Sequence, residues 1–431
     1  MFLRSRDPPL AGPTAADRKS GDRGHGRETR THGRPELVFF TPDITDVSTS
    51  KRAQGFLDYG FRLTVLGFRR DRYNQRYEPS WPYIALGRTE DGNYWQRARA
   101  LVSCIPVLIA NRRRLSGAAV VYARNIDQLL LALLTQLLFA RQARIAYEVL
   151  DIQPALVANV TIARILRWVE RVCMRRIGLL VVSSPAFVEC YYATIQAYRG
   201  AWFLLENKLD ASILALPLHT PRRNGALVDH RNGYKWVVAY VGLIRGRETF
   251  DLIRRIAARL HDTVLFEFHG ILTTVDSEAF HAALREHKNM IYRGSYINPQ
   301  DLRSIYEKVH FSWALDLEHV DHNSRWLRPC RFYEAGLYGI PCMAIRDFEI
   351  GRFIESMGVG WTFSPPYEDQ LVRFFETLSL AQYEKRCRRL RGLPVDNFVA
   401  RDDMSSLCRL LDGPPQRWME SLPGSAGGYV R

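Results

Sequence analysis

The stretch Trp236-Val-Val-Ala-Tyr-Val-Gly-Leu-Ile-Arg-Gly-Arg-Glu248 passes from an apolar, β-branched run into a loop of glycine and arginine. The run Trp236–Val241 predicts a buried strand, and Glu248–Leu260 predicts the helix that follows it. A strand, a loop and a helix in this order form the repeating unit of a parallel sheet covered by helices. The sequence on both sides of this stretch repeats the unit.

Downstream, four more apolar runs predict strands, at Thr263–His269, Met290–Arg293, His310–Leu315 and Pro341–Ala344. Helical patterns lie between and before them, at Ser277–His287, Asp301–Lys308 and Arg331–Leu337. This alternation predicts one Rossmann-like domain over residues 235–395.

Upstream, the same alternation predicts strands at Leu37–Phe40, Arg62–Leu66, Ala118–Tyr122, Arg144–Glu148 and Leu179–Ser183. Helices are predicted at Ser50–Tyr59, Ile126–Ala140 and Ile162–Arg175. We therefore expect a first Rossmann-like domain over residues 36–215. The segment 216–234 contains Pro217, Pro221 and Gly225, which break a helix, and it is predicted to be the linker. The expected fold class is α/β, with two Rossmann-like αβα domains facing a central cleft.

The length and the charge of the chain indicate how many domains it has and which ligands suit it. The chain has 431 residues, 47% of them hydrophobic, and a formal charge of +15. This length favours two domains, and the basic charge suits a phosphorylated ligand, an anionic membrane or nucleic acid. No zinc-finger spacing or RNP-like strand occurs, so nucleic acid is not expected as a partner.

The seven cysteines are scattered and form no CxxC pair, which predicts neither a disulfide framework nor a zinc site. No signal peptide or transmembrane run is evident, and a cytoplasmic location is expected. Residues 1–35 are polar and basic, and we expect them to be disordered. A translation start further along the chain is the alternative reading of this segment.

The most specific motif is Asn323-Ser-Arg-Trp-Leu-Arg-Pro-Cys-Arg-Phe-Tyr-Glu-Ala-Gly-Leu-Tyr-Gly-Ile-Pro-Cys342. It places Glu334 near the beginning of a helix that ends at Gly339 and Pro341, before an apolar strand. A carboxylate there can accept both hydroxyls of a ribose, while the helix N-terminus attracts phosphate. The alternative is a favourable charge near a helix N-terminus, followed by an ordinary helix stop.

This motif resembles the donor-site signature of the family 4 glycosyltransferases, which have the B architecture of two Rossmann-like domains. Glu334-Ala335 and Gly339-Ile340-Pro341 carry the resemblance. It implies a nucleotide-sugar donor site that includes Tyr333, Glu334 and Ala335, and a final helix, at 396–412, that crosses back to the first domain. A flexible tail is expected at 413–431.

The loop after Trp236–Val241 resembles the segment of this family that binds the donor's phosphates. Gly242, Arg245 and Arg247 are the matching residues. Guanidinium groups bind phosphate in a bidentate manner and stabilise a departing nucleoside diphosphate. Solvated arginines in a turn are the alternative.

The sequence departs from the family at one position. A second glutamate usually lies eight residues before Glu334, and here that residue is Trp326. Glu318 and Asp321 are candidate substitutes.

Loops after the strands of the first domain carry the candidate acceptor-side residues Asp46, Arg52, Arg124 and Asn125. Glu148 and Asp151 follow the fourth strand and are the candidate catalytic residues. Helix caps and surface ion pairs are the alternative for each. Three strings, at 122–127, 147–151 and 181–187, resemble the exopolysaccharide enzymes of succinoglycan biosynthesis. Asn207 matches an Asn-containing interdomain turn of the same relatives.

The resemblance implies transfer of a hexose from a nucleoside-diphosphate sugar to a carbohydrate acceptor, which we expect to be lipid-linked. No cofactor and no metal are expected, because no Asp-x-Asp segment is present. The apolar stretch 95–114, with basic ends, indicates peripheral contact with the inner face of the plasma membrane, and an internal helix with solvated ends is the alternative. A catalytically silent scaffold and a sugar-nucleotide epimerase are the alternative functions.

Overall fold

The computed structural model describes residues 35–70, 77–89, 94–216, 233–414 and 418. The N-terminal half contains the following elements: β1 Glu36–Thr41, α1 Val47–Tyr59, β2 Arg62–Arg69, β3 Tyr83–Arg88, α2 Tyr94–Ser103, α3 Ile105–Ala110, α4 Arg112–Leu115, β4 Ala118–Arg124, α5 Ile126–Leu138, β5 Arg144–Val149, α6 Pro154–Val157, α7 Thr161–Met174, β6 Leu179–Val182, the π-helical turn Phe187–Tyr192 and β7 Trp202–Leu204.

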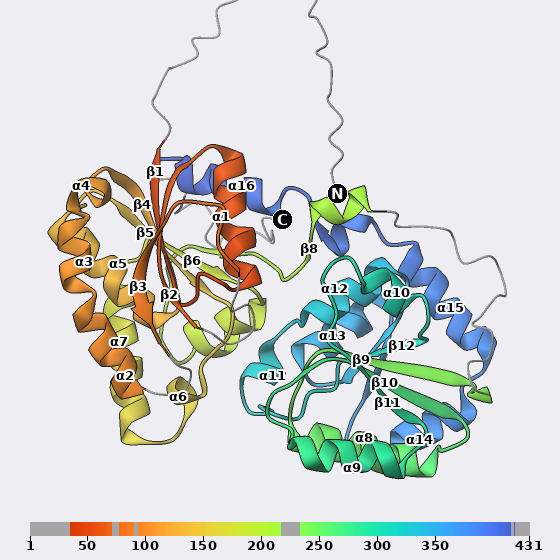
Figure 1. The fold of residues 1–431 in the computed structure, drawn as a ribbon. Helices are drawn as coiled ribbons and strands as arrows, with labels where there is room; N and C mark the ends of the chain where they lie inside the picture. Colours follow the sequence, from red (N-terminus) through yellow and green to blue (C-terminus); the bar gives the residue numbers. More distant parts are fainter. Residues whose placement is uncertain (1–34, 71–76, 90–93, 217–232, 415–417, 419–431) are drawn as a thin grey trace, which may run out of the picture. The chain divides into compact units, whose positions relative to one another are not determined.

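Within these residues, seven parallel strands form a sheet in the order β3-β2-β1-β4-β5-β6-β7. The middle residues of the central strands are apolar and buried, and helices cover both faces of the sheet (Figure 1). On β1, for example, Val38 packs into the core on one face and Phe39 into the core on the other.

The C-terminal half begins with β8 Leu209–Asp210 and the 3-10 turn Ala211–Ala215. It continues with β9 Trp236–Ile244, α8 Arg247–Arg259, β10 Val264–Leu272, α9 Ser277–Glu286, β11 Met290–Gly294, α10 Leu302–Tyr306, β12 Phe311–Trp313, α11 Asn323–Trp326, α12 Cys330–Leu337, β13 Cys342–Ile345, α13 Glu349–Met357, β14 Trp361–Phe363, α14 Tyr367–Thr377, α15 Leu380–Arg391, the 3-10 turn Val395–Asn397, β15 Val399–Ala400 and α16 Asp403–Asp412.

Six of these strands, as far as the structure describes them, form a second parallel sheet in the order β11-β10-β9-β12-β13-β14. A large apolar core that includes Trp236, Phe266 and Trp313 fills the space around it. The prediction of an α/β fold with two Rossmann-like halves is confirmed.

Ten strands and seven helices lie where the sequence predicts them, with small shifts at their ends. The sequence analysis did not anticipate the strands β3, β7, β8, β14 and β15 or the helices α6, α11, α13, α14 and α15. These five strands all lie at edges of their sheets. An edge strand is short and half-exposed, so its hydrophobic pattern is weak.

The C-terminal end of the chain differs in detail from the helix that the sequence predicts at 396–412. Val399 and Ala400 form β15, which pairs with β8, and the helix α16 begins only at Asp403. Leu407, Cys408 and Leu411 of α16 then pack into the core between the first sheet and α1, and Figure 1 shows α16 beside α1.

Residues 413–431 were expected to be flexible, and most of them lie outside the described residues. Trp418, however, is buried in the core on the α1 side of the first sheet. Its ring lies 4.6 Å from the Arg144 guanidinium carbon and its indole N–H donates to the carbonyl of Leu410. This part of the predicted tail is therefore held against the fold.

The apolar stretch 95–114 forms α2, α3 and part of α4 rather than one helix. Pro106 is the second residue of α3, where its missing N–H costs no helical hydrogen bond. The predicted linker 216–234 and the segment 1–35 lie almost entirely outside the described residues.

Candidate functional site

Two glycines lie at the carboxyl edge of the second sheet, where β9 and β10 end side by side. Gly242 has a φ of 108° and Gly270 a φ of 140°, values that L side chains rarely adopt. A Cβ at Gly270 would also overlap the carbonyl oxygen of Gly242. Gly270 is therefore needed for the close approach of the two strands, and Gly242 is partly exposed at this edge.

Arg245 follows β9 and lies at the same edge. Its guanidinium donates two hydrogen bonds to Oδ2 of Asp316, at 3.0 and 2.6 Å, and lies 3.2 Å from Oε2 of Glu318. Burial opposes the charged form of Asp316, but Arg245 outweighs it and lowers the pKa of that carboxyl. The arginine is thus fixed in place and charged.

Arg247 lies apart from this group. It is the first residue of α8, its side chain is 90% exposed, and its nearest carboxylate is Asp251, at 3.7 Å on the same helix. The structure brings Arg245 to the sheet edge but leaves Arg247 in solvent.

Glu334 is buried on α12, with 5% of its surface exposed. Asn298 donates to its Oε1 at 2.8 Å, and the hydroxyl of Tyr306 donates to its Oε2 at 3.2 Å. Burial raises the pKa of Glu334, whereas these two hydrogen-bond donors and the cations Arg331 and Lys51 lower it in part. Each carboxylate oxygen keeps a lone pair for a further donor.

Arg331 is a site residue that the sequence analysis did not single out. It lies in the first turn of α12, with its guanidinium carbon 4.5 Å from the centre of the Tyr240 ring. It donates to the carbonyl oxygen of Trp313 at 3.0 Å, and its Nη2 is the nearest atom to a Cβ built on Gly242, at 3.8 Å. The only sequence signal was its place in the motif, three residues before Glu334.

Tyr333 and Ala335, both predicted to contact the donor, are completely buried. The hydroxyl of Tyr333 donates to Glu206, a carboxylate that also pairs with Arg328 at 2.7 Å. The side chain of the interdomain candidate Asn207 donates to the Arg328 carbonyl at 3.4 Å. These residues fix α12 against the segment that leads to β8.

Trp326, at the position where the resemblance noted in the sequence predicts a glutamate, is 8% exposed and packs into the core of the first sheet. Its carbonyl accepts a hydrogen bond from the Ser184 hydroxyl, at 2.5 Å. Of the two candidate substitutes, Glu318 belongs to the Arg245 group, and its Oε1 also accepts from Thr274. Asp321 is exposed in the turn before α11.

Glu148 lies at the carboxyl end of β5 and is 1% exposed. Its Oε1 accepts two bonds from Arg52 on α1, and its Oε2 accepts two from Arg124 at the end of β4. Burial opposes the charge of Glu148, but Arg124 and Arg52 outweigh it and lower its pKa to about 2. The four bonds leave Glu148 fully engaged by protein groups.

The other two acceptor-side candidates are at helix starts. Asp46 caps α1 by accepting from the backbone N–H of Ser48, and it lies 3.9 Å from Arg124. Asn125 precedes α5 with a φ of 68°, and its backbone N–H donates to the Glu148 carbonyl. Asn125 tolerates this left-handed conformation better than most side chains do.

Asp151 is exposed after β5 and accepts a 3.0 Å hydrogen bond from the side chain of Asn323 on α11. Cys330, the first residue of α12, is exposed. The hydrogen bond from Asn323 joins Asp151, which follows a strand of the first sheet, to α11 of the C-terminal half.

Among the described residues, no helix has the length and apolar character needed to cross a bilayer. The same residues contain no group of three His, Cys, Asp or Glu side chains arranged to hold a metal ion.

No protein-family model matches the chain. It is 27% identical over 383 residues to the succinoglycan biosynthesis protein ExoL of Rhizobium meliloti (strain 1021), a match that covers 87% of this chain and 93% of that protein.

The fold is similar to those of solved glycosyltransferases. Anabaena HepE, solved in complex with UDP, matches with a TM-score of 0.62 and 11% identity over 88% of this chain and 99% of that one. WaaG, a glycosyltransferase of lipopolysaccharide biosynthesis, matches with a TM-score of 0.59 and 11% identity over 88% of this chain and 100% of its own.

A putative UDP-N-acetylglucosamine 2-epimerase from Listeria monocytogenes also shares the fold, with a TM-score of 0.52 and 11% identity over 88% of this chain and 96% of that one. Because the fold serves more than one chemistry, the residues of the site must decide the function. The resemblance that the sequence indicated is confirmed: the chain is a homologue of a succinoglycan biosynthesis protein, built on the B architecture of glycosyltransferases.

Proposed function

We propose that this protein transfers a hexose from a nucleoside-diphosphate sugar to a carbohydrate acceptor during exopolysaccharide biosynthesis. The observation that carries the proposal is the arrangement of Glu334, Arg331 and Arg245 around Gly242 at one sheet edge. It combines an oriented carboxylate with two fixed cations, as recognition of a nucleotide requires. The similarity to a succinoglycan biosynthesis protein over most of the chain supports the same conclusion.

In this proposal Glu334 binds the ribose. Asn298 and Tyr306 occupy one position on each carboxylate oxygen and so fix the orientation of the group. The remaining lone pairs accept the two adjacent hydroxyls of the sugar. A buried carboxylate with its geometry already set loses little entropy when the ligand arrives.

Arg331 and Arg245 bind the diphosphate and stabilise the charge that builds up as it leaves the sugar. Arg331 lies in the first turn of α12, where free backbone N–H groups also favour an anion. Arg245 is held at the edge by Asp316 and Glu318. These protein charges are proposed to serve without a metal ion or cofactor.

Asp151 is the catalytic residue that we propose on the acceptor side. Its carboxylate is exposed and is oriented by a hydrogen bond from Asn323. Glu148 instead acts as a positioning residue, because hydrogen bonds from Arg52 and Arg124 occupy both of its carboxylate oxygens.

We further propose that the protein works in the cytoplasm at the inner face of the membrane, on a lipid-linked acceptor. Helix α7 supports this location. Residues Ile162, Ile165, Trp168 and Val172 repeat at intervals of three or four, lie on one side of the helix, and are 40% to 62% exposed.

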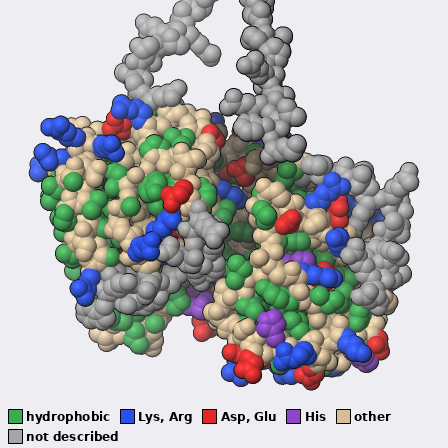
Figure 2. All heavy atoms as spheres, viewed as in Figure 1, with side chains coloured by type: hydrophobic (Ala, Val, Ile, Leu, Met, Phe, Trp, Pro, Cys, Tyr) green, Lys and Arg blue, Asp and Glu red, His purple; other side chains and the backbone are tan. Residues whose placement is uncertain are grey.

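Helices α3 and α4 pack on the same face of the first sheet as α7. Helix α2 adds the exposed Val102, and α3 and α4 add the exposed Ile109 and the exposed run Arg112–Arg114. Figure 2 shows hydrophobic and basic side chains together over this region. A surface of apolar side chains bordered by arginines fits an anionic bilayer.

The proposal is tested by incubating the purified chain with radiolabelled UDP-glucose, UDP-galactose or GDP-mannose and a lipid-linked oligosaccharide acceptor. Transfer of label to the acceptor is expected with one donor. Conversion of the donor without acceptor would identify an epimerase instead. Binding of UDP with no turnover under either condition would favour a scaffold.

A further inference from the structure

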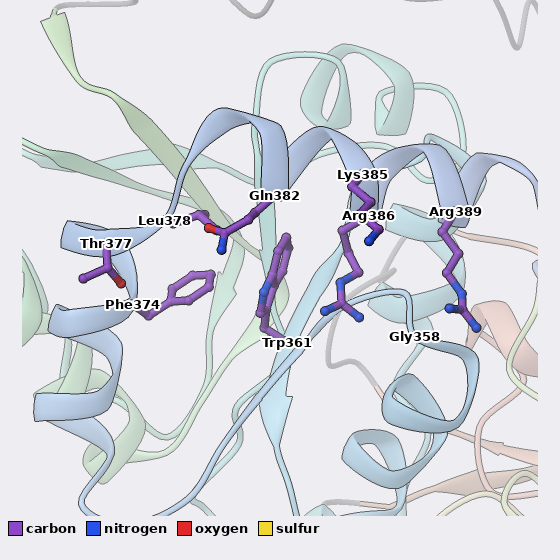
Figure 3. A pocket seen from close by; sticks show the side chains of 9 residues that line it. All are labelled: Gly358, Trp361, Phe374, Thr377, Leu378, Gln382, Lys385, Arg386 and Arg389. Atoms are coloured by element: carbon purple, nitrogen blue, oxygen red, sulfur yellow. The ribbon is translucent and has the colours of Figure 1, made fainter.

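A cavity of about 490 Å³ lies between β14, the end of α14 and one side of α15 (Figure 3). Its walls include Trp361 and Phe374, and Lys385, Arg386 and Arg389 project into it from α15. This volume is within the range of small-molecule sites in proteins, roughly 300–1,000 Å³.

The cavity is separate from the donor site because the two lie at opposite edges of the second sheet. All six strands are parallel, and Arg245 and Asp316 follow carboxyl ends of strands. Trp361, by contrast, is the first residue of β14. The carbonyl of Leu378, another residue that lines the cavity, accepts from Lys235, which immediately precedes β9. The cavity therefore lies at the amino edge.

The cations in the cavity have no acidic neighbour among the residues that line it. Lys385, Arg386 and Arg389 share one side of α15, at positions i, i+1 and i+4. Burial lowers the pKa of Arg386, and the like charge of Arg389 lowers it further. The two guanidinium groups therefore repel each other. An anion placed between them would remove this repulsion.

The apolar wall is aromatic. The rings of Trp361 and Phe374 lie 5.3 Å apart, and the guanidinium carbon of Arg386 lies 5.2 Å from the Trp361 ring. The amide oxygen of Gln382 accepts from Ser379, which leaves its amide nitrogen as a donor toward a ligand. A flat, partly polar group fits beside these rings, and phosphates fit beside the cations.

We propose that this cavity is a second nucleotide site, which binds the phosphate chain of a nucleoside triphosphate through Lys385, Arg386 and Arg389 and its base against Trp361 and Phe374. The site goes beyond the proposed transfer reaction, because it needs neither the donor nor the acceptor residues.

The test is titration of ATP into the full chain by calorimetry, in the presence of saturating UDP. One ATP per chain is expected. The double variant Arg386→Ala, Arg389→Ala should bind ATP at least about tenfold more weakly, because each loses a charge-assisted contact to phosphate. The control Arg388→Ala changes an arginine of the same helix that lies near Glu384, at 3.6 Å, and it should bind ATP as the unchanged chain does.

The variant Glu334→Gln should also retain this ATP binding, which separates the cavity from the donor site. Inorganic pyrophosphate should bind more weakly than ATP, because it has no base for the aromatic wall. The proposal is overturned by the absence of ATP binding beside UDP, by an unchanged affinity in the double variant, or by pyrophosphate binding as tightly as ATP. Unfolding curves and UDP binding of the double variant establish that it is folded.

Discussion

The side-chain amide of Asn298 donates a 2.8 Å hydrogen bond to Oε1 of Glu334, joining the loop after β11 to helix α12. Tyr306 of α10 donates to the other oxygen of the same carboxylate. Donors 36 and 28 residues before Glu334 in the sequence thus determine which way its carboxylate faces.

Removing these donors should weaken nucleotide binding without removing the carboxylate itself. We expect Tyr306→Phe to raise the dissociation constant for UDP roughly fivefold, equivalent to about 1 kcal/mol for one hydrogen bond. Glu334→Gln should have a larger effect, because it removes the charge as well. Calorimetric titration with UDP measures both, and equal affinity in all three proteins would contradict the role of Glu334.

Substitution of Arg331 tests the phosphate site, and substitution of Arg247 is its control. Arg331→Ala should cost about 2 kcal/mol of UDP binding, roughly thirtyfold, because a buried charge-assisted contact is lost. Arg331→Lys should be intermediate, since lysine keeps the charge but not the planar fork. Arg247→Ala should have no effect, because its side chain is 90% exposed and outside the group. A larger loss of UDP binding in Arg247→Ala than in Arg331→Ala would instead support the sequence-based assignment of Arg247 to the phosphates.

Glu148→Gln should lower the free energy of unfolding by about 3 kcal/mol at neutral pH, because it leaves two buried arginines without their shared carboxylate. Glu368→Gln is the control, since it breaks exposed pairs with Arg255 and Arg259 and should cost close to nothing. Urea unfolding measures both variants.

The ion pairs of Glu148 also predict that the stability of the protein depends on pH. The pKa of Glu148 falls from its ordinary 4.5 to about 2 in the folded protein, so folding binds fewer protons there. Its contribution to stability is therefore complete above pH 4.5 and is lost as the pH falls toward 2. The stability difference between the unchanged chain and Glu148→Gln should shrink across this window. A difference that stays constant would contradict the ion-pair explanation.

Trp326→Glu restores the residue that relatives carry at this position, and it should still damage the protein. The change places a charge in the core of the first sheet and removes a large apolar side chain, at a cost of roughly 3 kcal/mol or more. Trp326→Phe should lose less stability, because it keeps an apolar ring in the core. Restored stability together with faster sugar transfer in Trp326→Glu would instead place this position at the donor sugar.

The surface of α7 can be tested with vesicles. Trp168→Ser combined with Ile165→Ser should reduce sedimentation with phosphatidylglycerol vesicles, because both side chains are more than half exposed on one side of the helix. Leu380→Ser changes an equally exposed apolar residue on α15 and should leave vesicle binding intact. UDP binding should be the same in all variants. Equal sedimentation of all proteins would exclude α7 as the contact surface.

The sequence alone determined the order of strands and helices, because alternating apolar runs and helical patterns depend only on neighbours along the chain. It also predicted Glu334 and Arg245 as donor-binding residues, since each lies at a fixed offset from a strand or a helix start, and the structure shows both partly or fully buried with polar partners. The sequence did not predict the short edge strands β3, β7 and β14, whose patterns are too brief to read.

Only the tertiary structure decided which polar residues act together. Arg331 becomes a site residue because β9 brings Tyr240 and Gly242 against the first turn of α12. Arg247, two residues from Arg245, lies outside this group because its side chain on α8 is 90% exposed. Glu148 is paired with arginines 96 and 24 residues away in sequence. Such pairings depend on contacts between distant segments, which composition and periodicity do not encode.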